Sequence, residues 1–195
     1  MIEFIEEGHL YLIDGIVVPS VSEILHFLFP DKYKNVDSDT LQKKAIYGSK
    51  VHEAIECLEQ GNNLPELDEN QQFSIRQWQY LKGKNNIEVL IQEQMIHYLD
   101  EYAGRFDMVA NVNGYLSLCD IKTTATLDKE YLSWQLSFYE LANESMYHTR
   151  FEKLYAIWLP KRNCGQLVEI ERKSRNELLD VLKKFKESRK EIENG

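Results

Sequence analysis

Two carboxylates and a lysine flank a predicted β-turn in the middle of this chain. Asn113-Gly114 is a strong signal for a two-residue hairpin, because both central residues of a type I′ turn need positive φ. If these two residues are the whole turn, the strand pairing that follows places Asp107 directly opposite Asp120. Opposed side chains share a face of the sheet, with Cβ atoms roughly 4.5–5.5 Å apart. Lys122 lies two residues further along the face of Asp120.

Opposed carboxylates repel, so we expect the pKa of the pair to be raised when no cation is bound. Lys122 offsets the charge in part. A divalent cation offsets it better, and hard oxygen ligands suit Mg²⁺ or Mn²⁺. The alternative is a surface hairpin whose charged groups face water. The apolar neighbours favour a buried site; they are Phe106, Met108, Val109, Leu116, Leu118 and Ile121.

Composition points to one globular domain with a sizeable core. The chain has 195 residues, of which 43% are hydrophobic and 28% are charged. We divide the domain into an N-terminal hairpin and helix (1–37), a central core (38–172) and a C-terminal helix (173–195). The net charge of −9 argues against a protein that coats nucleic acid by bulk charge. It leaves room for an enzyme that holds phosphates in one locally basic groove.

The cysteines indicate a reducing compartment, and the hydropathy of the sequence indicates a protein without a membrane span. Cys57, Cys119 and Cys164 are far apart and odd in number, which fits free thiols rather than a disulfide framework or a zinc site. No apolar run approaches the roughly 18 residues of a membrane span. The acidic start of the sequence lacks a secretory pattern. We therefore expect a cytoplasmic protein with no membrane partner.

Hydrophobic periodicity, caps and turn residues predict the elements that must position these groups. An α/β order of helices and strands emerges, with a mixed central sheet flanked by helices and parallel pairing across one helix. The expected strands are His9–Ile13, Ile16–Val18, Ile87–Leu99, the two arms of the central hairpin, Phe151–Leu159 and Gln166–Glu171. The expected helices are Ser20–Phe29, Asp39–Gln60, Asp68–Lys82, Asp128–Tyr147 and Arg175–Glu193. The N-terminal hairpin and first helix are expected to be edge scaffolding.

Two of these elements carry further polar candidates. In the helix Asp39–Gln60, capped by Ser38 or Asp39, the inner stripe is expected to run from Leu41 through Ala45 and Gly48 to Leu58. Gly48 would let the helix approach the sheet and bring His52 to the carboxylates; a lone histidine at such a position is more often part of the core. Glu93 falls on the apolar face of the strand Ile87–Leu99, and a buried carboxylate needs a metal, Lys122 or Arg105 as a partner. Its alternative is a solvent-exposed strand end.

The motifs, taken in order, resemble the PD-(D/E)XK nucleases of the RecB-like and phage-exonuclease branch. Each motif is weak alone, but their joint order is specific. The matching segments are Gly48-x-x-x-His52, Gly104-Arg105-x-Asp107, Asp120-Ile121-Lys122 and Gln135-x-x-x-Tyr139. Pro19-Ser20-Val21-Ser22 is similar to a "PSVT" segment of phage members and of the mitochondrial genome-maintenance exonuclease. By periodicity alone, Gln135 and Tyr139 would be core packing.

The resemblance implies a restriction-endonuclease-like core that hydrolyses DNA phosphodiester bonds with one or two Mg²⁺ or Mn²⁺ ions. Metal ligands would be His52, Asp107, Asp120 and the Ile121 carbonyl; Lys122 would position or deprotonate water, and Glu93 would orient Lys122 or that water. DNA contacts would come from Ser20, Arg105, Gln135 and Tyr139. The branch that carries an iron–sulfur cluster uses four cysteines, so we expect no cluster here. Phage or prophage recombination or repair would be the setting, with a single-strand annealing or single-strand-binding protein as a partner.

Three other functions remain compatible with these residues. One is an endonuclease or junction resolvase on the same fold, which closed circular DNA separates from an exonuclease. Another is a catalytically silent DNA-binding module, against which the intact Asp107, Asp120 and Lys122 count. The third is a small metal-binding regulator without affinity for DNA.

Overall fold

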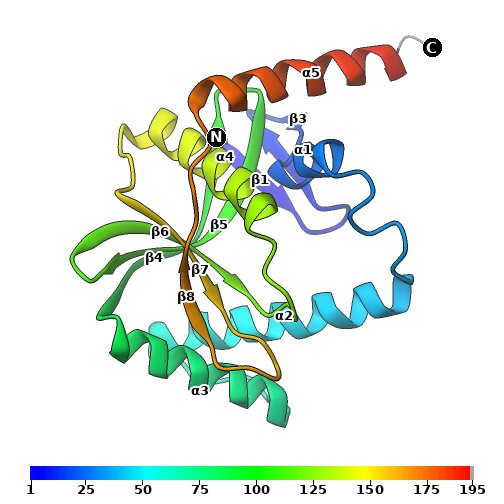
Figure 1. The fold of residues 1–195 in the computed structure, drawn as a ribbon. Coiled ribbons are helices and arrows are strands. Elements are labelled where there is room, and N and C mark those ends of the chain that lie inside the picture. Colours follow the sequence, from blue (N-terminus) through cyan, green and yellow to red (C-terminus); the bar gives the residue numbers. More distant parts are fainter. Residues whose placement is uncertain (194–195) are drawn as a thin grey trace.

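A five-stranded mixed sheet forms the centre of the computed structural model, which describes residues 1–193 (Figure 1). The strand order is β4-β5-β6-β7-β8. Only the β6–β7 pair is parallel within this sheet, and helix α4 makes the crossover between those strands. The strands are β4 (Ile87–Tyr98), β5 (Tyr102–Val112), β6 (Tyr115–Lys122), β7 (Lys153–Trp158) and β8 (Gln166–Glu169). This confirms the predicted α/β architecture, and its mixed sheet flanked by helices is consistent with a restriction-endonuclease-like core.

The Asn113-Gly114 turn sets the register of the central hairpin as predicted. Both residues have positive φ, +51° and +92°, and the Gly114 N–H donates to Oδ1 of Asn111 at 2.8 Å. Pairing runs from Val112↔Tyr115 to Met108↔Cys119 and stops there. Asp107 and Asp120 therefore follow immediately beyond the last pair of the β5–β6 ladder.

Side-chain caps fix where the helices begin. Ser20 and Glu23 form the predicted capping box at the start of α1. The second helix begins one residue earlier than predicted, because Asp37 rather than Ser38 or Asp39 accepts the N–H of Thr40. The helices are α1 (Val21–Leu28), α2 (Ser38–Glu59), α3 (Glu69–Lys84), α4 (Lys129–Tyr147) and α5 (Arg175–Glu193). None of them, within residues 1–193, is long and apolar enough to cross a membrane.

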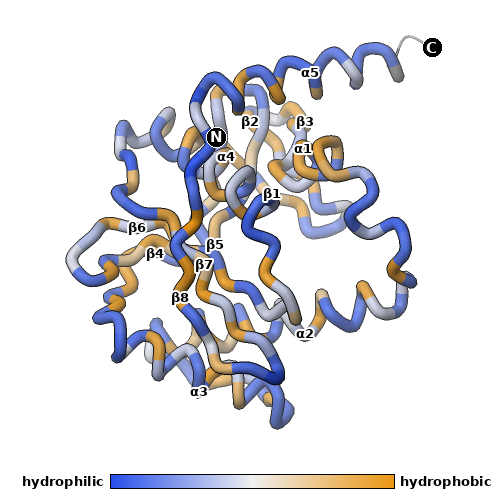
Figure 2. Tube along the Cα trace, viewed as in Figure 1, coloured by the Kyte–Doolittle hydropathy of each residue, from blue (hydrophilic) through white to orange (hydrophobic). Residues whose placement is uncertain are grey.

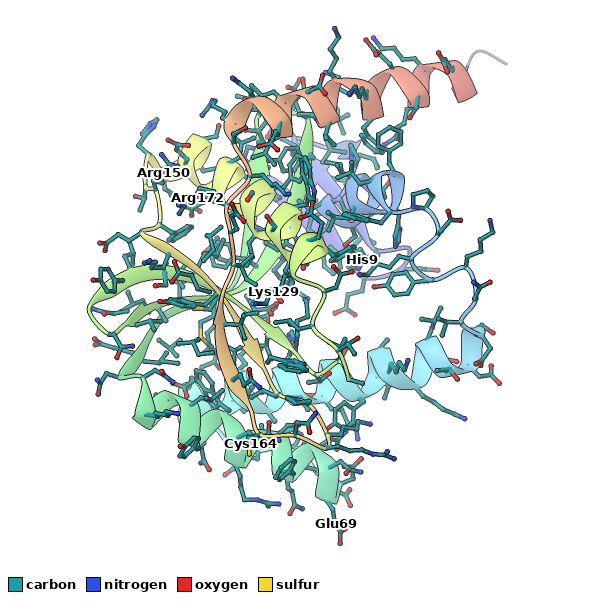
Figure 3. The ribbon with its side chains drawn as sticks, in the orientation of Figure 1. His9, Glu69, Lys129, Arg150, Cys164 and Arg172 are labelled. Atoms are coloured by element: carbon teal, nitrogen blue, oxygen red, sulfur yellow. The ribbon has the colours of Figure 1, made fainter. Side chains whose placement is uncertain are left out.

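Helices cover both faces of the central sheet. Helices α2 and α3 lie on one face, and α1, α4 and α5 lie on the other (Figure 1). Met108, Cys119 and Ile121 belong to the core between the sheet and helices α2 and α3. Phe106 and Leu118 belong to the core between the sheet and helices α1, α4 and α5. Apolar residues concentrate along the sheet, and along α5 polar segments alternate with short apolar ones (Figure 2). The side chains that fill the two cores are drawn in Figure 3.

A small antiparallel sheet precedes α1 and packs beside the central sheet. It contains β1 (Ile2–Ile5), β2 (Leu10–Ile13) and β3 (Ile16–Val18), of which only the β2–β3 hairpin was predicted. The β1 segment IEFI is short and lies among acidic residues, so its sequence gives little strand signal. The sheet is joined to β5 where the Ala103 N–H donates to the Pro19 carbonyl at 2.9 Å.

Two predicted apolar faces are wrong in part. The alternation expected along β4 breaks at a bulge between Val89 and Ile91, and Ile91 is exposed. Glu93, further along the strand, has a positive φ of +49°. In α2 the buried residues are Tyr47, Val51, Ala54 and Ile55, whereas Ala45 is exposed. The part of α2 before Tyr47 extends past the edge of the sheet, and none of its residues is buried (Figure 1).

Candidate active site

The site begins where pairing between β5 and β6 ends. There the backbone N–H of Ile121 donates to Oδ2 of Asp107 at 2.7 Å. This bond replaces the next rung of the ladder with a side-chain contact, so the Asp107 carboxylate lies at the opening between the two strands. The chain thereby brings the Asp107 carboxylate, the Ile121 carbonyl and the end of β6 that carries Lys122 to one point.

Asp120 and Lys122 form an ion pair beside this opening. Nζ of Lys122 lies 2.6 Å from Oδ2 of Asp120, and the Asp120 side chain is only 2% exposed. Burial raises the pKa of Asp120 to about 6, although Lys122 acts in the opposite direction. For Lys122, burial acts to lower the pKa, but the Asp120 and Asp107 carboxylates outweigh it and the pKa is raised. Lys122 is thus held as a cation.

His52 reaches the same point from α2. Its Nε2 donates to the Ile121 carbonyl at 3.1 Å, and its Nδ1 lies 3.5 Å from Oδ1 of Asp107. Burial acts to lower the pKa of His52, but the Asp107 carboxylate outweighs it and raises the pKa to about 8. Because Nε2 of His52 donates its hydrogen bond to the Ile121 carbonyl, Nδ1 is the ring nitrogen that faces the Asp107 carboxylate.

The pKa of Asp107 corrects one expectation. Burial acts to raise it, but the charges of His52 and Lys122 prevail, and the pKa of Asp107 is lowered. Repulsion alone predicted that both carboxylates would have a raised pKa. Instead, the pKa of Asp120 is raised and that of Asp107 is lowered. Neighbouring cations, which the hairpin register alone does not reveal, decide the sign for Asp107.

Glu93 joins the site from β4, beyond the bulge in that strand. Its Oε2 lies 3.0 Å from Nε of Arg105, so one of its two predicted protein partners is present. Burial, with a further contribution from Asp107, raises the pKa of Glu93 to about 7. One potential ligand atom from each of His52, Glu93 and Asp107 lies within 4.8 Å of the other two. Two carboxylates and an imidazole at this spacing fit a divalent cation.

Asp120 stands apart from that group of three. Its Oδ2 is buried and, among the described residues, makes the ion pair with Lys122 but no hydrogen bond of good geometry. The structure thus brings His52, Glu93 and Asp107 together as potential metal ligands. Asp120 is not one of this group and is instead paired with Lys122. A buried carboxylate oxygen without a directed donor retains capacity for a further cationic partner.

A cavity of about 560 Å³ opens over these groups. Most of the predicted site residues line it: Ser20, His52, Glu93, Arg105, Asp107, Ile121, Lys122 and Tyr139. Asp120 and Gln135 do not. Gln135 donates from Nε2 to the Tyr139 hydroxyl at 3.3 Å, and its Oε1 is buried without a partner in the described part of the chain. Gln135 is therefore placed to hold Tyr139 rather than to reach a ligand.

Gly104 makes room for Tyr139. A Cβ atom at position 104 would lie 2.7 Å from Cε1 of Tyr139 and 3.2 Å from Cγ2 of Val21. By contrast, a Cβ at Gly48 would lie 3.5 Å from Oγ1 of Thr123, an ordinary contact. The prediction that glycine is required at position 48 for close packing is therefore wrong, because a side chain would fit there; the position that requires glycine is Gly104.

Several lining residues were missed by the sequence reasoning. Glu53 and Glu56 follow His52 on α2, and Glu56 lies one turn after it, a spacing that could have signalled a shared face. His9 (labelled in Figure 3) and Tyr11 come from the N-terminal sheet. No sequence signal linked that sheet to the site, which depends on the junction between Pro19 and Ala103. The segment expected to be edge scaffolding is thus one wall of the cavity.

Comparison with known proteins gives remote structural likenesses. No family model matches the chain, and no curated protein matches it. The crystal structure of SSO0001 aligns over 86% of this chain and 74% of its own, with 16% identity and a TM-score of 0.49. That of a phage-related exonuclease from Haemophilus somnus 129PT aligns over 86% of this chain and 89% of its own, with 12% identity and a TM-score of 0.43.

Proposed function

We propose that this cavity hydrolyses phosphodiester bonds of DNA with a divalent cation, Mg²⁺ or Mn²⁺. One observation supports the proposal most directly: Lys122, held as a cation by Asp120, lines the same cavity as the three-residue group of His52, Glu93 and Asp107. A cation beside a group of potential metal ligands suits a reaction in which negative charge builds on a phosphate.

His52, Glu93 and Asp107 would hold the cation, with Asp120 and the Ile121 carbonyl as further oxygen donors. When bound, such a cation lowers the pKa of a water molecule and stabilises charge on the phosphate. In the metal-free site His52 is a cation near neutral pH, because its pKa is raised to about 8. Nδ1 of His52 would exchange its proton for the metal ion, so cation binding releases a proton.

Lys122 has the features of a charge-stabilising group. Its raised pKa means that it is protonated at neutral pH, so of the two predicted roles the geometry favours positioning over proton abstraction. The side chain is anchored by Asp120 and still reaches the cavity. It would contact a non-bridging oxygen of the phosphate and offset charge in the transition state.

The substrate strand would be positioned by Ser20, Arg105 and Tyr139. Arg105 is exposed and pairs with Glu93 through Nε, and its terminal nitrogens would reach a phosphate. The Ser20 oxygen accepts the Glu23 N–H, which leaves its hydroxyl proton to donate. Tyr139 is a buried phenol whose pKa burial raises well above its usual value, so it acts as a neutral donor.

The proposal extends to an exonuclease of phage or prophage recombination or repair, acting in the bacterial cytoplasm with a single-strand annealing or single-strand-binding protein. This part rests on the order of the sequence motifs; the free thiols of Cys57, Cys119 and Cys164 are compatible with the location. The test is digestion of end-labelled linear single- and double-stranded DNA beside a covalently closed circle, with Mn²⁺, Mg²⁺ or EDTA. We expect the linear forms to be degraded from an end and the circle to survive. Efficient cutting of the circle would instead identify an endonuclease.

A further inference from the structure

A second cavity, of about 500 Å³, lies on the opposite side of α2 from the candidate active site. Its lining includes Lys43, Tyr47 and Lys50 of α2, Gln71 of α3 and Lys161 after β7; we name these five residues the lysine pocket. Gly48, His52 and Glu56, on the same helix, line the first cavity. One helix therefore separates the two cavities.

The lysines of this pocket are available for an anionic ligand. Lys43 and Lys50 are exposed and make no ion pair with any residue in 1–193. Nζ of Lys161 lies 3.5 Å from the centre of the Tyr47 ring. That ring is fixed in turn, because the Tyr47 hydroxyl donates to the Asn70 carbonyl at 3.0 Å. The pocket thus holds one cation in place by a cation–π contact and leaves two others free to move to a ligand.

The local charge is unusual for this chain. The formal net charge of the chain is −9, yet the second cavity is lined by the three lysines of the lysine pocket against two carboxylates, those of Glu66 and Asp68. Oδ1 of Asp68 already accepts the Gln71 N–H at 2.8 Å as the cap of α3. Gln71 is buried and is a further polar residue of the lining; its Oε1 accepts the Asp68 N–H at 2.8 Å, which leaves its amide NH₂ as a donor. Lysine ammonium groups and a neutral amide are groups that bind nucleic-acid phosphates.

The width of α2 matches the spacing of two DNA backbones. A helix with its side chains is about 10–12 Å across, and the major groove of B-DNA is about 12 Å wide. Ile46, which lines the second cavity, is 54% exposed, and Ser49 and Glu53, which line the first, are exposed as well, so the face of α2 between the two cavities is open to solvent. A duplex can therefore place one backbone in the candidate active site and the other in the lysine pocket, with α2 between them.

We propose that the lysine pocket binds phosphates of the DNA strand that is not cut, so that α2 lies in the groove of a duplex. The inference rests on the proposed nuclease function and adds a substrate class to it, duplex rather than single-stranded DNA. Contacts of this kind release counterions, so their loss lowers the salt dependence of binding by about one unit of slope per lysine.

The test compares the triple variant Lys43→Gln/Lys50→Gln/Lys161→Gln with wild type. Affinity for a duplex and for a single strand of equal length is measured in EDTA over a series of salt concentrations. The matched control is Lys84→Gln/Lys183→Gln/Lys184→Gln, which removes the same charge from exposed positions outside the pocket. We expect the pocket variant to lose about tenfold or more in duplex affinity and about three units of salt slope, with a much smaller loss for the single strand.

Two results would overturn the inference: equal losses for duplex and single strand, or equal losses in the pocket variant and the control. If the triple variant fails to fold, Lys43→Gln/Lys50→Gln leaves the contact between Lys161 and Tyr47 intact and predicts a loss of about two units of slope. Because binding is measured without a divalent cation, it is independent of cleavage. A wild type that cuts DNA while the pocket variant keeps its duplex binding refutes only this inference. A wild type that cuts no DNA with either cation refutes the proposed function.

Discussion

A Cβ atom on Gly104 would lie 2.7 Å from Cε1 of Tyr139, closer than two carbon atoms approach each other without displacement. Gly104→Ala must therefore move Tyr139 or the strand. We expect it to reduce the free energy of unfolding by about 1–3 kcal/mol, the range for overpacking a core, and to reduce cleavage with it. Urea unfolding of the variant and of wild type measures the difference.

Gly48→Ala is the matched control for that substitution. A Cβ there meets Oγ1 of Thr123 at 3.5 Å, and alanine is about 1 kcal/mol better than glycine inside a helix. We expect unchanged or higher stability. If Gly48→Ala destabilises the protein more than Gly104→Ala does, the packing described at both positions is wrong.

His52 is expected to matter more for activity than for stability. Its side chain is 26% exposed and its two ring nitrogens face the Ile121 carbonyl and the Asp107 carboxylate. His52→Ala should lower the rate of cleavage in Mn²⁺ by about 10–100-fold, the usual effect of disturbing a metal site. Without metal the melting temperature should fall only modestly, because the attraction between His52 and Asp107 is lost while the apolar core is untouched. A variant that unfolds readily yet retains the rate per folded molecule would show that His52 is only a core residue.

Asp107→Asn should weaken the response to metal. A cation that binds only the folded site raises the melting temperature, so wild type should gain more from Mn²⁺ than the variant does. Without metal the variant should be less stable at pH 7, because a lowered pKa of Asp107 contributes stability above its usual value of 3.8 and loses it as the pH falls. Asp180→Asn, on the exposed face of α5, serves as control and should keep the wild-type response. An equal response in both variants would remove Asp107 from the metal site.

Glu93 should make the metal-free protein less stable as the pH rises. Its pKa is raised from 4.5 to about 7, so the folded state binds the proton more tightly than the unfolded state. The resulting stability is fully present below pH 4.5 and is lost as the pH rises through about 7. His52 adds a loss of the same sign, between pH 6.5 and about 8. Between pH 5 and pH 8 in EDTA, wild type should lose more unfolding free energy than Glu93→Gln; equal losses would show that Glu93 is not held in the protonated form.

Local sequence signals predict much of this fold. Asn113-Gly114 determines the hairpin register because only a few turn types accept positive φ at both residues. The capping box of Ser20 and Glu23 likewise marks the start of α1. These features depend on residues within a few positions of one another, so an amino-acid sequence contains them in full.

The remaining features depend on tertiary contacts. No glycine or proline in the sequence marks the bulge in β4 or the positive φ of Glu93 beyond it, and the bulge is visible only in the pairing with β5. The lowered pKa of Asp107 depends on His52, which approaches from another helix. Likewise, His9 enters the cavity because the N-terminal sheet is joined to β5 at Ala103. Periodicity predicts which face of an element is apolar, but it does not specify which distant element covers that face.

The central claim is that Lys122 and the adjoining ligand group form one metal-dependent centre for DNA cleavage. Its most direct test is the rate of cleavage of end-labelled linear DNA by wild type and by Lys122→Ala, each in Mn²⁺ and in EDTA, with thermal unfolding to confirm that both are folded. We predict cleavage by wild type in Mn²⁺ only, and a rate lower by about 10²-fold or more for the folded variant, as expected when a group that stabilises transition-state charge is lost. Cleavage that persists in EDTA, or a folded Lys122→Ala that cuts as fast as wild type, would contradict the claim.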